Sequence, residues 1–167
     1  MTYEYHATPY DVSATGFYFS TYEEYLEKSA SHRNAYGQHV EEYEIQFIDG
    51  ENCELFKALS VNQANLDLWF NAFEQLEQEE AVKAIYLAEY LGENMDVIID
   101  KLDDVCLFQG TPVEYAENFL EETGLIDLIP ENLRYYFDYE SYARDMVYSG
   151  DICEITVSGE NYVVWGG

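Results

Sequence analysis

The sequence predicts an α+β protein built from three small domains: an α+β domain, a mainly helical domain and a second α+β domain. Apolar residues alternate at strand spacing toward both ends of the chain, whereas they recur at helical spacing through its middle. The 167 residues are 48% hydrophobic and 17% aromatic, which is enough apolar material for a core. We expect the domains to span residues 1–61, 62–104 and 105–167.

The first domain begins with a predicted strand over residues 14–19. Ser20 or Thr21, followed three residues later by Glu23 or Glu24, is the capping box of a helix that runs to about Ala30. These signals predict a strand followed by a helix.

A second strand is predicted over residues 43–48, where Tyr43, Ile45 and Phe47 alternate with polar residues. Asp49-Gly50 then marks a turn before residues 55–61. The first sixty residues are therefore expected to mix helix and strand.

Three helices are predicted in the middle domain. Apolar residues recur at helical spacing within residues 66–76 and again within 82–91, with an acidic break at 77–80 between them. Asn94 is placed to cap the third helix, whose apolar face lies within residues 95–102.

The last domain opens with a short apolar strand over residues 105–108. Thr111-Pro112-Val113-Glu114 then combines an N-cap, a proline at the first helical position and a capping-box glutamate. Gly124 is placed to end this helix in a left-handed turn.

Two further helices and a closing hairpin are predicted after that turn. The helices cover residues 130–137 and 139–148, and Asp138 caps the second, which ends near Gly150. Strands over residues 152–157 and 162–165 form the hairpin.

The chain carries a net charge of −27, from 34 acidic and 7 basic residues. Residues 1–60 hold three basic against eleven acidic residues (−8), residues 61–110 two against eleven (−9), and residues 111–167 two against twelve (−10). This even distribution of negative charge along the chain is typical of a polyanion, whereas an acidic tail or pocket would concentrate the charge in one segment. In duplex DNA, 27 charges occupy about 46 Å, or about 13 to 14 base pairs.

Two rows of carboxylates are predicted to lie on helix surfaces. Each follows the spacing i, i+3 or i+4, and i+7, opposite an apolar face; the rows are Glu114, Glu117 and Glu121, and Asp96, Asp100 and Asp103. Like charges at this spacing destabilise a helix by about 0.2 to 0.5 kcal/mol per pair. A single row of this kind is usually just a solvated helix face, and it is the total charge of the chain that favours a function for these two.

The charge excludes binding to nucleic acid and to anionic membranes, because both need basic residues. Cys53, Cys106 and Cys153 stand far apart and predict no disulfide framework, and no leader or membrane span is recognised. We expect a cytoplasmic protein whose partner is basic. Divalent cations and adaptation to a saline cytosol are the other readings of the charge.

No catalytic or metal-binding motif is recognised, so we expect neither enzymatic activity nor a cofactor nor a metal site. His6, His32 and His39 lack metal-ligand spacing. Carboxylates are too numerous for any pair to indicate a hydrolase, although that reading stays open.

Residues 128–146 resemble the family of ArdA-type antirestriction proteins. The resemblance is carried by Tyr136-Phe137-Asp138-Tyr139-Glu140 and Ala143-Arg144-Asp145, and extends back through Phe108-Gln109-Gly110, Glu114–Glu117 and Glu42–Ile45. The first forty residues echo the family only at Tyr10 and Gly16-Phe17-Tyr18.

The resemblance implies a protein of a mobile genetic element that imitates bent B-form DNA. It implies an elongated, curved chain of three domains that forms a homodimer through the last one. It also implies a target, the methyltransferase and specificity subunits of Type I restriction-modification enzymes. The alternative is an acidic decoy or chaperone for another basic protein, such as a histone-like factor.

We predict that carboxylates imitating phosphates make the contact with this partner. They are Glu23, Glu24, Glu27, Glu74, Glu77, Glu80, Glu89, Glu93, Asp96, Asp100, Asp103, Asp104, Glu114, Glu117, Glu121, Glu122, Asp138, Glu140 and Asp145.

Overall fold

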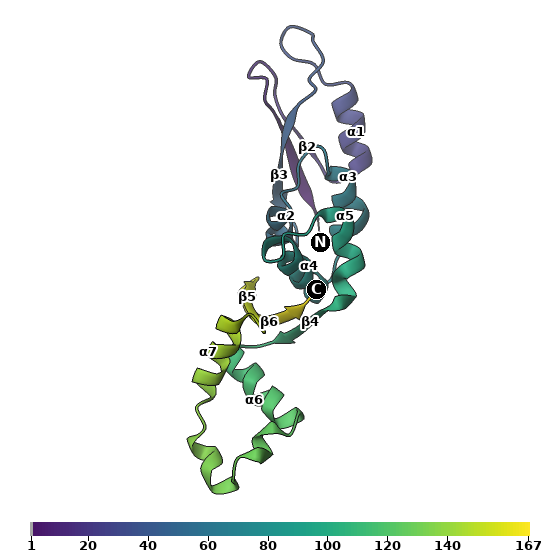
Figure 1. Cartoon of the computed structure of the whole chain (residues 1–167). Helices are drawn as coiled ribbons and strands as arrows, with labels where there is room; N and C mark the ends of the chain where they lie inside the picture. Colours follow the sequence, from purple (N-terminus) through teal and green to yellow (C-terminus); the bar gives the residue numbers. More distant parts are fainter. Residues whose placement is uncertain (1) are drawn as a thin grey trace. The chain divides into compact units, whose positions relative to one another are not determined.

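The computed structural model describes residues 2–167 and confirms a mixed α+β protein. Two compact units divide the chain, Met1–Ile99 and Asp100–Gly167. Each of them contains one three-stranded antiparallel sheet (Figure 1). The predicted division into three domains stays a prediction.

The sheet of the first unit has the strand order β2-β1-β3. Its strands are β1 (Glu4–Pro9), β2 (Phe17–Phe19) and β3 (Tyr43–Asp49). The predicted strand at residues 43–48 is confirmed, and the one at 14–19 is shorter than predicted. The central strand β1 was not predicted, although Tyr5 and Ala7 alternate with polar residues as in a strand with one buried face; it ends in a proline, a residue that is unfavourable within strands.

The helices of the first unit are α1 (Tyr22–Ala30), α2 (Cys53–Ala58), α3 (Leu66–Leu68) with a π-helical continuation (Trp69–Phe73), α4 (Gln78–Glu89) and α5 (Met95–Lys101), which runs on into the second unit. They begin where predicted in three cases, α1, α3 and α5, whereas α2 was not predicted as a helix and α4 begins within the predicted acidic break at 77–80. The predicted helix at 66–76 is broken into an α and a π segment. The segment after the predicted Asp49-Gly50 turn, to which no element was assigned, is helical at α2.

An aromatic core holds the first sheet against its helices. Tyr5 is fully buried, and its ring centroid lies 5.5 Å from that of Phe19 and 5.2 Å from that of Phe70. Trp69 is fully buried and packs edge-on to Phe56. Large rings contribute much apolar area per residue, which explains how so charged a chain forms a core.

The second unit places β6 at the centre of its sheet, in the order β4-β6-β5. Its elements are β4 (Val105–Gln109), α6 (Pro112–Glu122), α7 (Tyr139–Ser149), β5 (Cys153–Val157), β6 (Glu160–Gly166) and 3-10 helices at Leu102–Asp104, Leu125–Leu128 and Glu131–Tyr136. The closing hairpin, β4 and both α-helices are confirmed. The segment predicted as a helix over 130–137 is a 3-10 helix.

Glycines in the left-handed backbone conformation end α6 and α7 where predicted. Gly124 has φ of 74° after α6, and Gly150 has φ of 85° after α7. Tyr115, Ile152 and Val163 form the core beneath these helices.

Candidate protein-binding surface

Acidic side chains lie almost entirely on the surface. Of the 34, only Glu4, Asp11, Glu24, Glu74 and Glu93 are not exposed, which leaves 29 exposed. The first unit holds nineteen acidic against four basic residues (−15) and the second fifteen against three (−12). Each unit is therefore a polyanion in its own right.

Helix α6 shows how the fold turns carboxylates outward. The Thr111 hydroxyl accepts a hydrogen bond from the Glu114 amide at 3.3 Å, and Pro112 occupies the first turn. Tyr115, Ala116 and Leu120 are buried. The opposite face displays the exposed carboxylates Glu114, Glu117 and Glu121, and Glu122 is exposed at the last position of the helix.

The second predicted row is also exposed, residue by residue. Asp96 and Asp100 lie on α5, and Asp103 lies on the 3-10 helix that follows it. Ile98 and Leu102, on the apolar side of the same segment, are buried. Asp96 belongs to the first unit, and Asp100 and Asp103 belong to the second.

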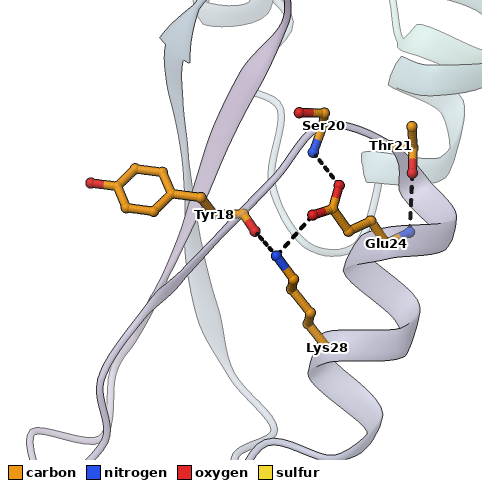
Figure 2. Close-up of polar contacts among 5 residues, drawn as sticks. All are labelled: Tyr18, Ser20, Thr21, Glu24 and Lys28. Atoms are coloured by element: carbon orange, nitrogen blue, oxygen red, sulfur yellow. Dashed lines mark hydrogen bonds and ion pairs between the residues drawn. The ribbon is translucent and has the colours of Figure 1, made fainter.

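Helix α1 uses one of its glutamates locally. The Thr21 hydroxyl accepts from the Glu24 amide at 3.1 Å, and the Glu24 carboxylate accepts from the Ser20 amide at 3.0 Å (Figure 2). The Lys28 ammonium donates to Glu24 Oε1 at 2.8 Å and to the Tyr18 carbonyl at 2.7 Å (Figure 2). The hydrogen bond from Lys28, followed by the one from the Ser20 amide, lowers the pKa of Glu24. Glu24 therefore has a structural role.

Glu74 does not fit the outward-facing role predicted for it. Its side chain is buried, and its carboxylate accepts a hydrogen bond from the Tyr5 hydroxyl at 2.7 Å. The same hydroxyl accepts from the Trp69 indole nitrogen at 2.9 Å. Burial raises the pKa of Tyr5. Glu74 thus completes a buried network, and we leave it out of the surface.

Two other helices begin at carboxylates of the predicted set. Glu77 and Glu80 form a reciprocal capping box at the start of α4, and both are exposed. Asp138 caps α7, where hydrogen bonds from the Ser141 hydroxyl and amide lower the pKa of its carboxyl. An exposed cap still presents its remaining lone pairs to a partner.

The remaining predicted residues divide by exposure as follows. Glu93 is half-buried; those exposed are Glu23, Glu27, Glu89, Asp104, Glu140 and Asp145. We call the exposed members of the predicted set, together with Glu24 and Glu93, the carboxylate surface.

Sequence reasoning missed further exposed carboxylates. They are Glu41, Glu42, Glu44, Asp49, Glu51, Glu54, Asp67, Glu79, Asp127, Glu131, Asp151, Glu154 and Glu160. The alternation in β3 signals Glu44, since Tyr43 and Ile45 on either side of it are buried. The loop residues carry no such signal, because irregular backbone has no fixed period.

Concave features are modest. Within residues 2–167, no group of three or more histidines, cysteines or carboxylates is arranged to hold a metal ion. A groove of about 580 Å³ in the second unit is lined by apolar and aromatic residues with Asp145 and Asp151. The imidazole of His32 bonds the Tyr43 hydroxyl at 2.9 Å, and that of His39 bonds the Ser29 carbonyl at 3.0 Å.

Fold and surface together define a class: a small, strongly acidic α+β protein that spreads its charge over both units. The family model for the antirestriction protein ArdA matches residues 4–160. The chain belongs to this ArdA family of antirestriction proteins, as the resemblance of residues 128–146 indicated. Membership implies an antirestriction function. A search of curated proteins finds no match to the chain, and no helix in residues 2–167 has the length and apolar character needed to cross a membrane.

Proposed function

We propose that this protein inhibits Type I restriction-modification enzymes by occupying the DNA groove of their methyltransferase and specificity subunits. The observation that carries the proposal is the exposure of 29 carboxylates over both units of a folded scaffold. A groove that binds duplex DNA is lined with lysine and arginine, because phosphate contacts supply much of the affinity. Exposed carboxylates offer those cations the same charge.

Magnitudes favour a collective mechanism. An exposed ion pair contributes about 0 to 1 kcal/mol, because water screens it and long side chains lose freedom. Ten such pairs at the upper end of this range total about 10 kcal/mol, which corresponds to a complex between micromolar and nanomolar, whereas one pair contributes little. The net charge of −27 also steers the protein toward a basic groove and speeds the encounter.

Occupancy of the groove excludes DNA, so inhibition is competitive and stoichiometric. A homodimer, which the family resemblance implies, would double the number of carboxylates offered to the enzyme. The protein itself performs no chemical step in this scheme, and it acts in the cytoplasm, where the enzyme meets incoming DNA.

Displacement of DNA tests the proposal. A fluorescent duplex is bound to a purified Type I methyltransferase with its specificity subunit, and this protein is added at several salt concentrations. We expect displacement with an inhibition constant that weakens steeply as salt rises. An affinity unchanged between low and physiological ionic strength would refute the electrostatic mechanism, and failure to displace DNA at any salt would refute the target site.

A further inference from the structure

One end of the first unit is less acidic than the rest of it, although its loops also hold Asp11, Glu41 and Glu42. Residues 12–22 and 28–40 contain no aspartate or glutamate, and the second stretch carries Lys28, Arg33 and two histidines. Figure 1 shows the loops at residues 10–16 and 31–42 at the same end of the sheet. A hydrogen bond from the Ala35 amide to the Ser13 carbonyl at 3.1 Å joins them. We call residues 11–13 and 33–38 the tip.

Apolar side chains of the tip point into solvent. Val12 is fully exposed and Tyr36 is 79% exposed, among the largest values for hydrophobic residues in the chain. Both sit in loops joined by hydrogen bonds rather than in a helix or strand. Exposed apolar groups gathered on a loop tip are typical of surfaces that contact another protein.

The tip is held in shape before any partner binds. The side-chain nitrogen Nδ2 of Asn34 donates to the Asp11 carboxylate at 2.8 Å and to the Gln38 side-chain oxygen at 3.1 Å. The side-chain oxygen Oδ1 of Asn34 accepts from the backbone amides of Tyr36 and Gln38, at 2.9 Å each. Asp11 also accepts from the Ser13 amide and hydroxyl. Preorganisation of this kind reduces the entropy lost on binding. The one carboxylate of the tip is thus used as an internal brace.

The charge of the tip indicates what it meets. A basic groove would repel Arg33 and would gain nothing from Val12 or Tyr36. Duplex DNA is disfavoured, because the whole protein repels its negative charge. A second copy of this chain is not expected at the tip, because the homodimer that the family resemblance implies forms through the last domain. What complements the tip is a neutral to acidic protein surface with an apolar component.

We propose that the tip docks on such a surface of the restriction enzyme, beside its DNA groove, and supplies the part of the affinity that does not depend on salt. This inference rests on the proposed function. The carboxylate surface then accounts for the salt-dependent attraction, and the tip determines the position at which the protein binds along the groove of the enzyme. DNA has no counterpart to the tip, so this contact would distinguish the inhibitor from the substrate.

Variants of the tip test the proposal in the DNA-displacement assay with the full-length protein. In Val12→Ser/Tyr36→Ser we expect affinity to fall by about tenfold or more, as for buried aromatic anchors. The slope of log affinity against log salt stays that of the parent, because no charge is removed. Tyr148→Ser, which alters another strongly exposed tyrosine, is the matched control and keeps full affinity.

Reversing the charge of Arg33 gives a second test, in which a gain or a loss of affinity distinguishes the two possible surroundings of the tip. Arg33→Glu adds negative charge, so it strengthens binding if the tip faces the basic groove and weakens it if the tip faces a neutral to acidic surface. We expect weakening, whereas Lys57→Glu, at another exposed cation of the same unit, does not weaken binding. Circular dichroism establishes that each variant is folded.

The outcomes separate the two proposals. If the parent displaces DNA and the tip variants match it at every salt concentration, or Arg33→Glu binds more tightly, the tip proposal is wrong and the groove proposal stands. If the parent displaces no DNA, both are wrong. If light scattering shows that tip variants change the oligomeric state instead, the tip is a contact between copies and the proposal is overturned.

Discussion

At the scale of the residue, surroundings decide what a carboxylate does. Glu74 and Glu77 are three residues apart, yet Glu74 is buried against Tyr5 and Glu77 is exposed at a helix start. A buried carboxylate needs hydrogen bonds to offset its lost hydration, and Glu74 accepts them from the Tyr5 hydroxyl and from the side-chain amide Nε2 of Gln75 at 3.0 Å. Identical chemistry thus serves the core in one case and the surface in the other.

Tyr5→Phe removes the centre of this buried network. Loss of the hydroxyl leaves the Trp69 indole N–H and a Glu74 oxygen without their partner, so we expect the first unit to lose about 1 to 3 kcal/mol of unfolding free energy. Urea denaturation followed by tryptophan fluorescence measures this loss. Because the chain has two tryptophans, a Trp165→Phe background reports on Trp69 alone.

The matched control is Tyr36→Phe, which removes a hydroxyl from an exposed side chain and should change stability by less than about 0.5 kcal/mol. Equal stabilities of the Tyr5→Phe variant and its parent would mean that water replaces the missing hydroxyl, contrary to this account of the core.

At the scale of the element, short sequence signals fix where helices begin. Side chains of Thr21, Thr111 and Asp138 each accept a hydrogen bond from the amide three residues on. The contacts of Glu24 extend to the neighbouring strand, because Lys28, which donates to Glu24, also donates to the Tyr18 carbonyl in β2 (Figure 2). This arrangement ties α1 to its neighbouring strand.

Glu24→Gln should therefore destabilise the protein in a pH-dependent way. Folding lowers the pKa of Glu24 below its ordinary value of 4.5, so its ionised form stabilises the fold above that pH. This contribution is lost as the pH falls through the lowered pKa. We expect the difference in unfolding free energy between parent and variant to be largest near pH 7 and to shrink below pH 4.5.

A double-mutant cycle with Lys28→Met tests whether the stability change caused by Glu24→Gln comes from the interaction between Glu24 and Lys28. Since Lys28 is the main cause of the lowered pKa, Glu24→Gln should change stability less in the Lys28→Met background. A difference that stayed constant from pH 7 to pH 3 would show that the Glu24 charge contributes nothing to folding.

At the scale of the whole molecule, charge is the dominant property. Both units are strongly acidic, at −15 and −12, so neither is a neutral scaffold for the other. Repulsion among like charges destabilises a compact state, and the buried aromatic cluster around Tyr5 offsets it in the first unit. A basic partner would relieve the same repulsion on binding.

Because exposed pairs contribute little individually, inhibition should depend on clusters of carboxylates. We expect Glu117→Gln alone to change the inhibition constant less than about fivefold. Replacing Glu114, Glu117 and Glu121 together should weaken it by one to two orders of magnitude, and should lower the salt slope by up to about three. The DNA-displacement assay measures both quantities.

Glu74→Gln serves as the control for this series, because it removes a charge that is buried and keeps an oxygen to accept from Tyr5. It should leave the salt slope unchanged. A single surface substitution that abolished inhibition in a folded protein would instead indicate a localised site.

The sequence by itself determined the mixed α+β class, most helix starts and the polyanionic character. Capping boxes, as at Thr111, and apolar periodicity involve residues that are close together in the chain, so they can be recognised in the sequence alone. Total charge is simply additive.

Only the tertiary structure decided which carboxylates face inward and which apolar side chains face outward. Glu74 is buried because strand β1 brings Tyr5 to it across 69 positions of sequence, and the tip forms because Asn34 reaches Asp11 across 23. Such contacts depend on which distant segments pair, and neither periodicity nor composition records that pairing.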